Sequence, residues 1–407
     1  MNERLSAARA VCLCAPRSGA TKRRKKNGIA PASAMKRRSG PAKTNQQHAM
    51  TSARRGMMAC LLVIHFALAG SAFAQESAIS TDNPVQVPQG VEVLSNLVVQ
   101  IESSLRAEVS VMVKSVAVTP DGNTLAVACD DHTIRILSVV EMDLSKTLTG
   151  HTDLIKSLAY DDAGERLISV GNDGRMLVYD CQADYKVIRK VEGVPALSCV
   201  VFSPDGQTIA AGDFDGQVYL LEQEGQNTVN RTVKCPSKDL RSLAFRDDGK
   251  LLVAGGRDGY LHLINLEQGN QIRSVELHLG RIHSLNFAYE SSVVVSAGRD
   301  GTVALFDTET MAELARVAVS TGQLFSARIL DDRHVAVAGS DDVIRIVDMQ
   351  REQIVEQING HQGSIAAMTS SGNLLFSGGF DATLRRWELS GVKSPDGRSS
   401  VIENGTN

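Results

Sequence analysis

The sequence predicts an all-β fold, and three observations lead to that class. Seven aspartates, which we call the marker aspartates, recur at intervals of 40 to 43 residues. Each lies between two short runs rich in β-branched residues, as in Leu167–Tyr179, a pattern that favours a hairpin. Most units also carry an earlier turn, such as Pro204-Asp205-Gly206, so each unit is interpreted as four strands. Seven four-stranded units at this period predict a seven-bladed β-propeller with antiparallel blades. The marker aspartates are Asp131, Asp173, Asp215, Asp258, Asp300, Asp341 and Asp381.

The first 74 residues differ in composition from the rest of the chain. Residues 1–49 are interpreted as a basic disordered leader or as the result of a mis-assigned start, because their Lys and Arg clusters fit no targeting signal. Residues 50–74 have the layout of a secretory signal, with Arg54-Arg55, an apolar run and small residues up to Ala74. We expect cleavage between Ala74 and Gln75 and a periplasmic or secreted mature protein. The apolar run is shorter than the about 20 residues that cross a bilayer, so no integral membrane span is expected in the mature chain.

The remaining chain divides into three predicted parts: a polar linker at 75–96, the propeller at 97–389 and a flexible tail at 390–407. The tail has little strand character, so the last unit lacks a fourth strand, and an open blade edge would expose unpaired backbone groups. The segment Leu97–Leu105 precedes the first unit and occupies a fourth-strand position by register. We expect this segment to pair with the third strand of the last blade and to close the ring.

The units resemble the WD40 repeat family. Gly150-His151 and Gly360-His361 match the Gly-His dipeptide of that family, and Trp387-Glu388 matches its closing dipeptide. The resemblance covers about residues 98–389, although five units lack the Gly-His and the Trp occurs once. This resemblance, together with the predicted signal sequence, indicates an exported WD40 protein of bacterial type.

The resemblance also implies buried hydrogen-bond networks inside the blades. In the family, the marker aspartate binds the His, the His binds a Ser or Thr, and that hydroxyl reaches the Trp. One unit matches all four positions, and a second has Tyr in place of Trp. The two sets are His361, Ser377, Asp381 and Trp387, and His151, Ser169, Asp173 and Tyr179. We interpret them as structural tetrads, because such networks fix a blade and perform no chemistry.

The chain offers few features for nucleic-acid binding or catalysis. After residue 74 it has 29 basic and 45 acidic residues, a net charge of −16, whereas a phosphate backbone needs a basic face. No nucleophile elbow, phosphate-binding loop or metal-binding His motif occurs. Asp pairs such as Asp161-Asp162 would suggest calcium, but they lack the Asp-x-Asp-x-Asp-Gly spacing and lie at turns. No catalytic residue, metal or cofactor is therefore predicted.

Arginines gather in two neighbouring units, on the face that usually binds partners in this family. The residue before the marker aspartate is Arg257 in one unit and Arg299 in the next. The same units place Asp239, Arg241, Arg281 and His283 at the start of their first strands. This set is either ordinary surface scatter, since exposed arginine is common, or a patch for an acidic partner surface. Lys114 and Lys156 are expected on the opposite side of the ring.

These observations favour a non-enzymatic, exported scaffold that binds protein partners and no nucleic acid. The alternative is an enzyme, or a cofactor- or metal-binding propeller that uses its central channel, because fold alone does not decide function. A subunit of an exported redox or surface complex is a third interpretation, which differs from the first only in its partner. Four cysteines follow the signal, and their spacing leaves open whether any pair forms a disulfide.

Overall fold

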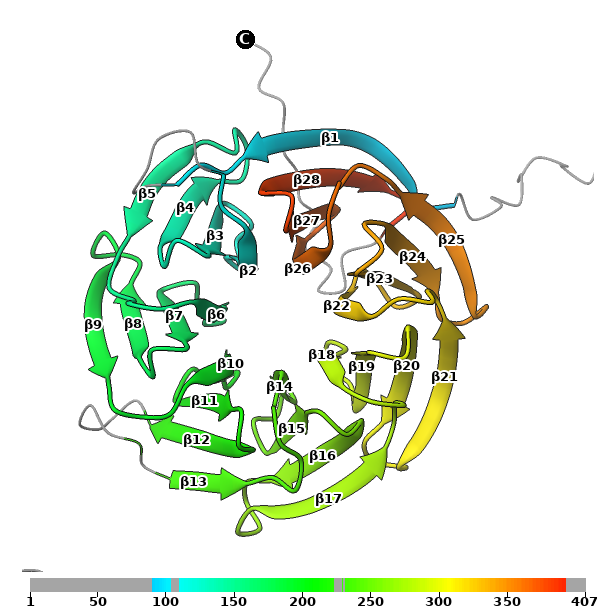
Figure 1. The fold of residues 1–407 in the computed structure, drawn as a ribbon. Helices are drawn as coiled ribbons and strands as arrows, with labels where there is room; N and C mark the ends of the chain where they lie inside the picture. Colours follow the sequence, from blue (N-terminus) through cyan, green and yellow to red (C-terminus); the bar gives the residue numbers. More distant parts are fainter. Residues whose placement is uncertain (1–89, 104–109, 223–228, 230, 393–407) are drawn as a thin grey trace, which may run out of the picture. The chain divides into compact units, whose positions relative to one another are not determined.

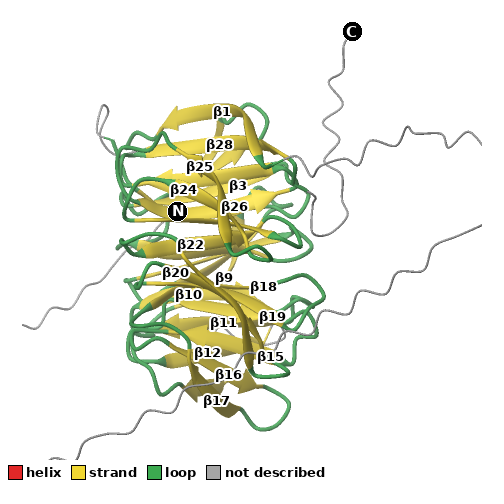
Figure 2. Ribbon diagram, turned by 90° about the vertical axis from the view of Figure 1, so that its right-hand side faces the viewer, coloured by secondary structure: helices red, strands yellow, loops and turns green. Residues whose placement is uncertain are grey.

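The computed structural model describes residues 90–103, 110–222, 229 and 231–392. The chain separates into two compact units, Met1–Thr81 and Asp82–Asn407, and all described residues belong to the second. Within the described ranges there are 28 strands and no helix, and the strands form seven sheets of four (Figures 1 and 2). The predicted all-β propeller is thereby confirmed. The expected leader, signal sequence and most of the linker and tail lie outside the described residues.

The blades are numbered from the N-terminal end of the repeat array. Blade 1 contains β2 (Val113–Val118), β3 (Thr124–Cys129), β4 (Ile134–Ser138) and β5 (Leu144–Leu148). Blade 2 contains β6 (Ile155–Tyr160), β7 (Arg166–Gly171), β8 (Met176–Asp180) and β9 (Lys186–Val191). Blade 3 contains β10 (Leu197–Phe202), β11 (Thr208–Asp213), β12 (Gln217–Glu222) and β13 (Arg231–Lys234). Blade 4 contains β14 (Ser242–Phe245), β15 (Leu251–Gly255), β16 (Tyr260–Asn265) and β17 (Gln271–Glu276).

Blade 5 contains β18 (Ile282–Phe287), β19 (Val293–Gly298), β20 (Thr302–Asp307) and β21 (Ala312–Ala318). Blade 6 contains β22 (Leu324–Ile329), β23 (His334–Gly339), β24 (Ile344–Asp348) and β25 (Gln353–Ile358). Blade 7 contains β26 (Ile365–Ser371), β27 (Leu374–Gly379), β28 (Thr383–Ser390) and the N-terminal strand β1 (Glu92–Gln100). In each blade the first strand is the innermost and the fourth is the outermost (Figure 1). The first strands of neighbouring blades contact each other all the way round, including β26 with β2, so the ring is closed.

The ring is closed by β1, as the unpaired edge of the last unit predicted. β1 pairs antiparallel with β28, with Leu97 opposite Arg386 and Gln100 opposite Thr383. The strand begins at Glu92 rather than at the expected Leu97, so the last residues assigned to the polar linker belong to the propeller. Residues 92–96 resemble a linker in sequence because β1 is the outermost strand of its blade and is largely exposed. Such a strand can contain polar residues, here Ser95 and Asn96. Residues 104 and 105 of the expected segment are not among those described.

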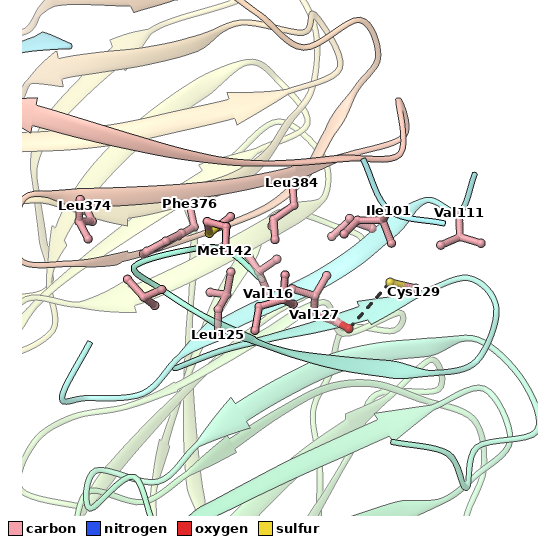
Figure 3. Close-up of a cluster of buried hydrophobic side chains, with 13 residues drawn as sticks. Ile101, Val111, Val116, Leu125, Val127, Cys129, Met142, Leu374, Phe376 and Leu384 are labelled. Carbon is pink, nitrogen blue, oxygen red and sulfur yellow. Dashed lines mark hydrogen bonds between the residues drawn. The ribbon is translucent and has the colours of Figure 1, made fainter. Parts of the chain in front are cut away.

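Each junction between neighbouring blades has its own hydrophobic core. Seven clusters of buried side chains are present, and each combines residues of two adjacent blades. Figure 3 shows the cluster at the junction where the ring closes, in which Leu125 and Val127 of blade 1 join Phe376 and Leu384 of blade 7. The second strands of the blades are buried almost along their whole length, so both faces of each blade carry apolar side chains that pack against the neighbouring blades.

Hydroxyl groups link successive first strands across the junctions. A serine in the first strand of one blade accepts a hydrogen bond from a backbone N–H in the first strand of the next blade, at 2.9 to 3.3 Å. These serines are Ser115, Ser157, Ser242, Ser284 and Ser326. At the junction of blades 3 and 4, Ser198 donates to the carbonyl of Leu240 instead. Blade 7 has Ala367 at the serine position, so its junction with blade 1 cannot form this bond.

The tight turn after each marker aspartate requires a left-handed backbone at its second residue. Gly174 has φ 64°, and a Cβ at this position would lie 2.0 Å from the carbonyl oxygen of Val194. Only glycine fits there. In blades 1, 6 and 7 the same place is taken by His132, Asp342 and Ala382 at φ 65°, 62° and 60°, at the cost of a left-handed non-glycine residue.

Candidate functional site

The marker-aspartate turns and the loops that enter the first strands lie together on one face of the ring, which we call the marker face. The turn and the loop are joined by backbone hydrogen bonds, such as Asn172 N–H to the Leu154 carbonyl in blade 2 and Arg299 N–H to the Arg281 carbonyl in blade 5. The side chain of the marker aspartate completes this joint in several blades. The face is thus fixed by the same contacts that hold each blade together.

Blade 7 brings the four residues of the first expected tetrad together. His361 Nδ1 lies 2.9 Å from Asp381 Oδ2, and His361 Nε2 lies 2.7 Å from Ser377 Oγ. Trp387 Nε1 donates to the same Ser377 oxygen at 2.8 Å. Burial lowers the pKa of His361, an effect that Asp381 only partly offsets. A neutral, enclosed imidazole between two fixed partners stabilises the blade.

Blade 2 brings the second expected set together in the same way. His151 Nδ1 lies 3.0 Å from both carboxylate oxygens of Asp173, and His151 Nε2 lies 2.7 Å from Ser169 Oγ. The backbone N–H of Thr152 also donates to Asp173, at 2.8 Å. Tyr179 is 2% exposed, and burial raises its pKa to about 12. Its hydroxyl is therefore kept protonated beside Ser169.

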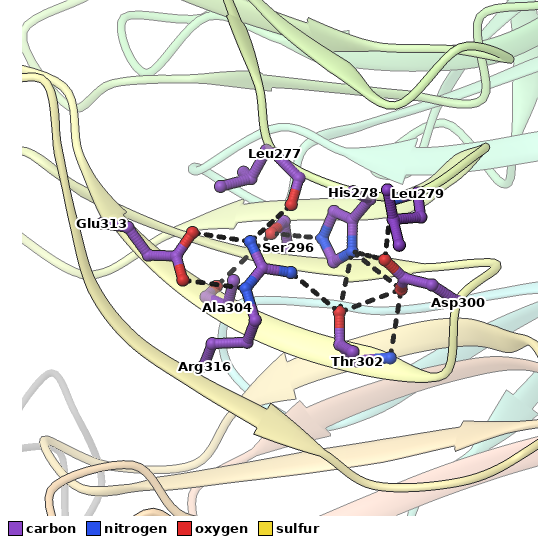
Figure 4. A network of polar contacts seen from close by, with 9 residues as sticks. All are labelled: Leu277, His278, Leu279, Ser296, Asp300, Thr302, Ala304, Glu313 and Arg316. Atoms are coloured by element: carbon purple, nitrogen blue, oxygen red, sulfur yellow. Dashed lines mark hydrogen bonds and ion pairs between the residues drawn. The ribbon is translucent and has the colours of Figure 1, made fainter. Parts of the chain in front are cut away.

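Blade 5 contains a third network that the motif comparison did not identify. His278 Nδ1 lies 3.0 Å from Asp300 Oδ1, and His278 Nε2 lies 2.8 Å from Ser296 Oγ (Figure 4). Arg316 donates to Thr302 Oγ1 at 3.0 Å, and Thr302 in turn donates to Asp300 at 2.9 Å. Although burial alone would raise the pKa of Asp300, the bonds from His278, Leu279 N–H and Thr302 hold it well below its usual range.

His278 was missed because leucine precedes it where the motif has glycine. The signal that would have revealed it is spacing: His278 lies 22 residues before its marker aspartate, as His151 does in blade 2. In blade 4 a serine takes the place of the histidine that binds the marker aspartate. There Ser237 donates to Asp258 and also contacts His262 Nε2, whose Nδ1 lies 2.7 Å from Ser274 Oγ.

The arginine sector of blades 4 and 5 is organised around one buried carboxylate. Asp239 is 3% exposed and has φ 56°. Arg241 Nε lies 2.8 Å from Asp239 Oδ1, Arg257 Nη2 lies 3.5 Å from Asp239 Oδ2, and Arg281 also pairs with Asp239 Oδ2. Burial would raise the pKa of Asp239, but Arg241 and Arg281 hold it below its usual value. One negative charge is thus shared among three guanidinium groups, which leaves an excess of positive charge.

The arginines differ in how far they reach into water. The Arg257 side chain is 66% exposed, whereas those of Arg241 and Arg281 are 30% and 23% exposed. Arg299 is exposed, and its stem runs beside Gly280, but no ion pair joins it to Asp239. The structure therefore brings three of the four predicted arginines together and places Arg299 next to them.

His283 adds no charge to the sector at neutral pH. Burial, together with the positive charges of Arg281 and Arg241, lowers its pKa to about 4. Its ring packs against Phe325 with centroids 5.2 Å apart, and Nε2 has no hydrogen-bond partner in the described structure. The imidazole is a neutral, partly satisfied group at the inner edge of the arginine sector.

Of the two lysines Lys114 and Lys156, only Lys156 is influenced by a charge of the arginine sector. They belong to blades 1 and 2, across the ring from blades 4 and 5. After burial, the positive charge of Arg241 is the main influence that lowers the pKa of Lys156, followed by that of Lys114. The two lysines therefore belong to blades on the other side of the ring, and the positive charge of Arg241 nevertheless influences Lys156.

The other candidate catalytic or metal-binding residues are bound to structural partners. In the first turns, Asp161 accepts from Arg166 Nε at 2.7 Å, and Asp331 lies 2.9 Å from His334 Nδ1. In the portion of the chain that is described, no cluster of three or more His, Cys, Asp or Glu side chains could hold a metal ion. The four described cysteines are free thiols, and burial raises the pKa of Cys199 to about 12. Over the described ranges, no helix is long and apolar enough to cross a membrane.

Comparison with known proteins adds sequence evidence to this geometry. A model of the WD40 domain of anaphase-promoting complex subunit 4 matches residues 95–163 and 200–290, and a model of the WD domain, G-beta repeat, matches residues 352–388. An uncharacterized WD repeat-containing protein of Synechocystis is 29% identical over 97 residues, which are 24% of this chain and 28% of the relative.

Two further relatives show similar partial matches. The 66 kDa stress protein of Physarum polycephalum is 27% identical over 150 residues, covering 35% of this chain and 23% of the relative. A guanine nucleotide-binding protein subunit beta of Arabidopsis thaliana is 34% identical over 71 residues, covering 17% of this chain and 19% of the relative. The chain spans less than a third of the length of each of these three proteins. Because both family models match repeats that fold here as propeller blades, the chain belongs to the WD40 repeat family, whose propellers are typically protein-interaction scaffolds.

Proposed function

We propose that this propeller is an exported, non-enzymatic scaffold that binds an acidic surface of a partner protein through its marker face. The observation that carries the proposal is the arginine sector of Arg241, Arg257 and Arg281 around Asp239, with Arg299 beside it. Guanidinium groups suit carboxylates because they present several N–H donors in a fixed fork. The remainder of the chain after residue 74 is acidic, so this sector is where an anionic partner meets least repulsion.

The construction of the face supports docking rather than chemistry. The His, Ser and Asp groups that would otherwise be candidates for catalysis are held in the buried networks of blades 2, 5 and 7. They fix the loops of the marker face, so a partner meets a surface that loses little conformational freedom on binding. Scaffold function in the WD40 family agrees with this arrangement.

The docking proposal is tested by charge reversal with a matched control. Immobilised wild-type protein and the double variant Arg257→Glu/Arg299→Glu are used to capture proteins from a native envelope fraction, and the bound proteins are quantified by mass spectrometry. The control variant is Arg231→Glu/Arg273→Glu, which has the same charge change on exposed residues of the outer strands β13 and β17.

The expected result is a partner with an acidic surface that is lost from the first variant and kept by the control. Binding should weaken as salt rises, because the Debye length falls from about 10 Å at 0.1 M to about 3 Å at 1 M. Melting temperatures of both variants should stay close to wild type. Equal loss from the two variants would reduce the effect to net charge and would reject the sector as a docking site.

Export is part of the proposal and rests on the signal-like residues 50–74. N-terminal sequencing of the native protein should begin at Gln75 or within a few residues of it. An intact cytosolic protein that starts at Met1 would contradict export while leaving the docking proposal open.

A further inference from the structure

The first strands of the seven blades begin around the ring axis at the marker face, and one residue near the start of each occupies an equivalent position. In six blades this residue is skipped in the pairing register between the first and second strands, which marks a bulge. A bulge re-aims the side chain that it carries. The seven residues, which we call the axial set, are Lys114, Lys156, Ser198, Arg241, His283, Phe325 and Ala366.

The axial set is cationic and contains no acid. Three of its members are Lys or Arg, and they come from blades 1, 2 and 4. Arg241 shares the carboxylate of Asp239 with two other arginines. Lys156 has no hydrogen-bond or ion-pair partner within the described part of the chain, and Lys114 lies over the ring of Phe380, 4.2 Å from its centroid. Neither lysine thus forms a direct ion pair in the described part of the chain, although Asp130 raises the pKa of Lys114, and Asp153 and Asp239 raise that of Lys156, from a longer distance.

Burial makes this arrangement unfavourable in the free protein. Lys114 and Lys156 are each only partly exposed, and burial lowers the pKa of both. The positive charges of Arg241 and Lys114 lower the pKa of Lys156 further, and Asp153 and Asp239 offset part of this effect. An anion placed among them would restore the interactions that the lysines lost on leaving water.

Aromatic side chains accompany the cations around the axis. Phe380 lies beside Lys114, Phe214 lies 5.1 Å from the Arg241 guanidinium, and Phe325 packs on His283. Phe380 is 45% exposed. A ligand at the axis therefore meets positive charge next to aromatic surface, which suits a peptide segment that carries acidic side chains.

We propose that the axial set is a carboxylate-binding site in which Lys114, Lys156 and Arg241 receive an Asp or Glu side chain from a segment of the docked partner. This inference rests on the proposed function, since the carboxylate belongs to the partner. It differs in place, because Arg257 and Arg299 form the outer part of the marker face, whereas the axial set surrounds the ring axis.

The test measures binding of a fluorescein-labelled, acetylated hexaglutamate peptide by fluorescence anisotropy to the purified propeller at low salt. A hexaglutamine peptide serves as the uncharged control. Wild type should bind the hexaglutamate peptide, and Lys156→Gln should weaken binding by about tenfold or more, as expected for loss of one charge-assisted hydrogen bond. Lys156→Arg keeps the charge and should retain most of the affinity. Arg257→Gln should have a much smaller effect.

The outcomes separate this inference from the proposed function. If only Arg257→Gln and Arg299→Gln weaken binding of the hexaglutamate peptide, the axial site is rejected, whereas docking through the arginine sector is retained. Free citrate is tested as a competitor of the peptide. If its affinity per carboxylate group equals that of the peptide, the ligand is a small anion and its origin in a partner segment is rejected. Absence of peptide binding to folded wild type, verified by its melting temperature, would overturn the inference.

Discussion

Blades 7 and 4 use similar residues for opposite purposes. In blade 7, Asp381 binds His361, and His361 and Trp387 both contact Ser377. The blade is completed by a strand from the other end of the chain. In blade 4, the marker aspartate Asp258 is exposed and is held by Ser237, while the buried Asp239 binds three arginines at the surface. The polar groups of blade 7 are bound to each other inside the blade, whereas the arginines around Asp239 lie at the surface.

The difference shows where mutations should affect stability and where they should affect binding. A carboxylate with buried donors cannot be removed without leaving those donors unmatched. An exposed arginine can be removed with little effect on folding, because its charge is already solvated. The contrast between the two blades can therefore be tested by unfolding measurements.

The largest effect is expected from removing β1. Deleting residues 92–100 opens the edge of β28 and removes Val93 and Val99, which pack against the cores on either side of blade 7. We expect a loss of more than about 5 kcal/mol in the free energy of unfolding, or loss of a cooperative transition. Urea unfolding followed by circular dichroism measures it. Truncation of residues 393–407 is the control, and equal losses from the two deletions would contradict the role of β1.

A smaller effect is expected at the marker aspartates, and it should differ between the blades. Asp381→Ala removes the acceptor of the Gln362 N–H and leaves the buried His361 Nδ1 with only the longer contact to Thr383 Oγ1, at a cost of about 1 to 3 kcal/mol. Asp258→Ala, the matched change in blade 4, should cost no more than about 0.5 kcal/mol because the residue is exposed and Ser237 keeps its contact with His262. Equal losses in urea unfolding would show that the two blades depend on their aspartates alike.

The smallest effect is expected from the pH dependence of stability. Burial lowers the pKa of His361 in blade 7, and burial with Arg281 and Arg241 lowers that of His283 to about 4. The unfolded value is about 6.5, so between these values the unfolded chain binds more protons than the folded one. The free energy of unfolding should be at its full value above pH 6.5 and fall as the pH drops toward about 4.

The variant His283→Asn isolates the contribution of the arginine sector to this slope. Its urea midpoint should decline less steeply than that of wild type between pH 6.5 and 4.5. Asp381 and Asp300, whose pKa values are lowered, add a further loss below about pH 4 as they become protonated, and this part should be the same in both proteins. If the urea midpoints of wild type and His283→Asn fall equally steeply with pH above 4.5, the lowered pKa of His283 does not contribute to the pH dependence of stability.

The sequence predicted the blades well because the periodic aspartates and their tight turns are local signals. It located β1 only approximately, since Glu92, Ser95 and Asn96 are polar residues of an exposed outer strand and look like linker. His278 escaped motif comparison because Leu277 stands where the motif has glycine. The sharing of the Asp239 carboxylate by Arg241, Arg257 and Arg281 depends on the side-chain conformations within the sector. Repeat spacing predicts which residues share a sector, but it does not predict which of their side chains form ion pairs.

The serines that join successive first strands have a consequence for how the ring comes apart. Each bond ties the backbone of one blade to a side chain of its predecessor, so melting of any blade removes a bond from its neighbour and spreads the damage along the chain. Unfolding is thereby coupled from blade 1 through blade 7, with Ser198 maintaining the link between blades 3 and 4. The coupling is interrupted at Ala367, where blade 7 meets blade 1. This junction is held instead by the hydrophobic core that blades 7 and 1 share and by Arg386, which donates from β28 to the carbonyl of Val139 at 2.7 Å.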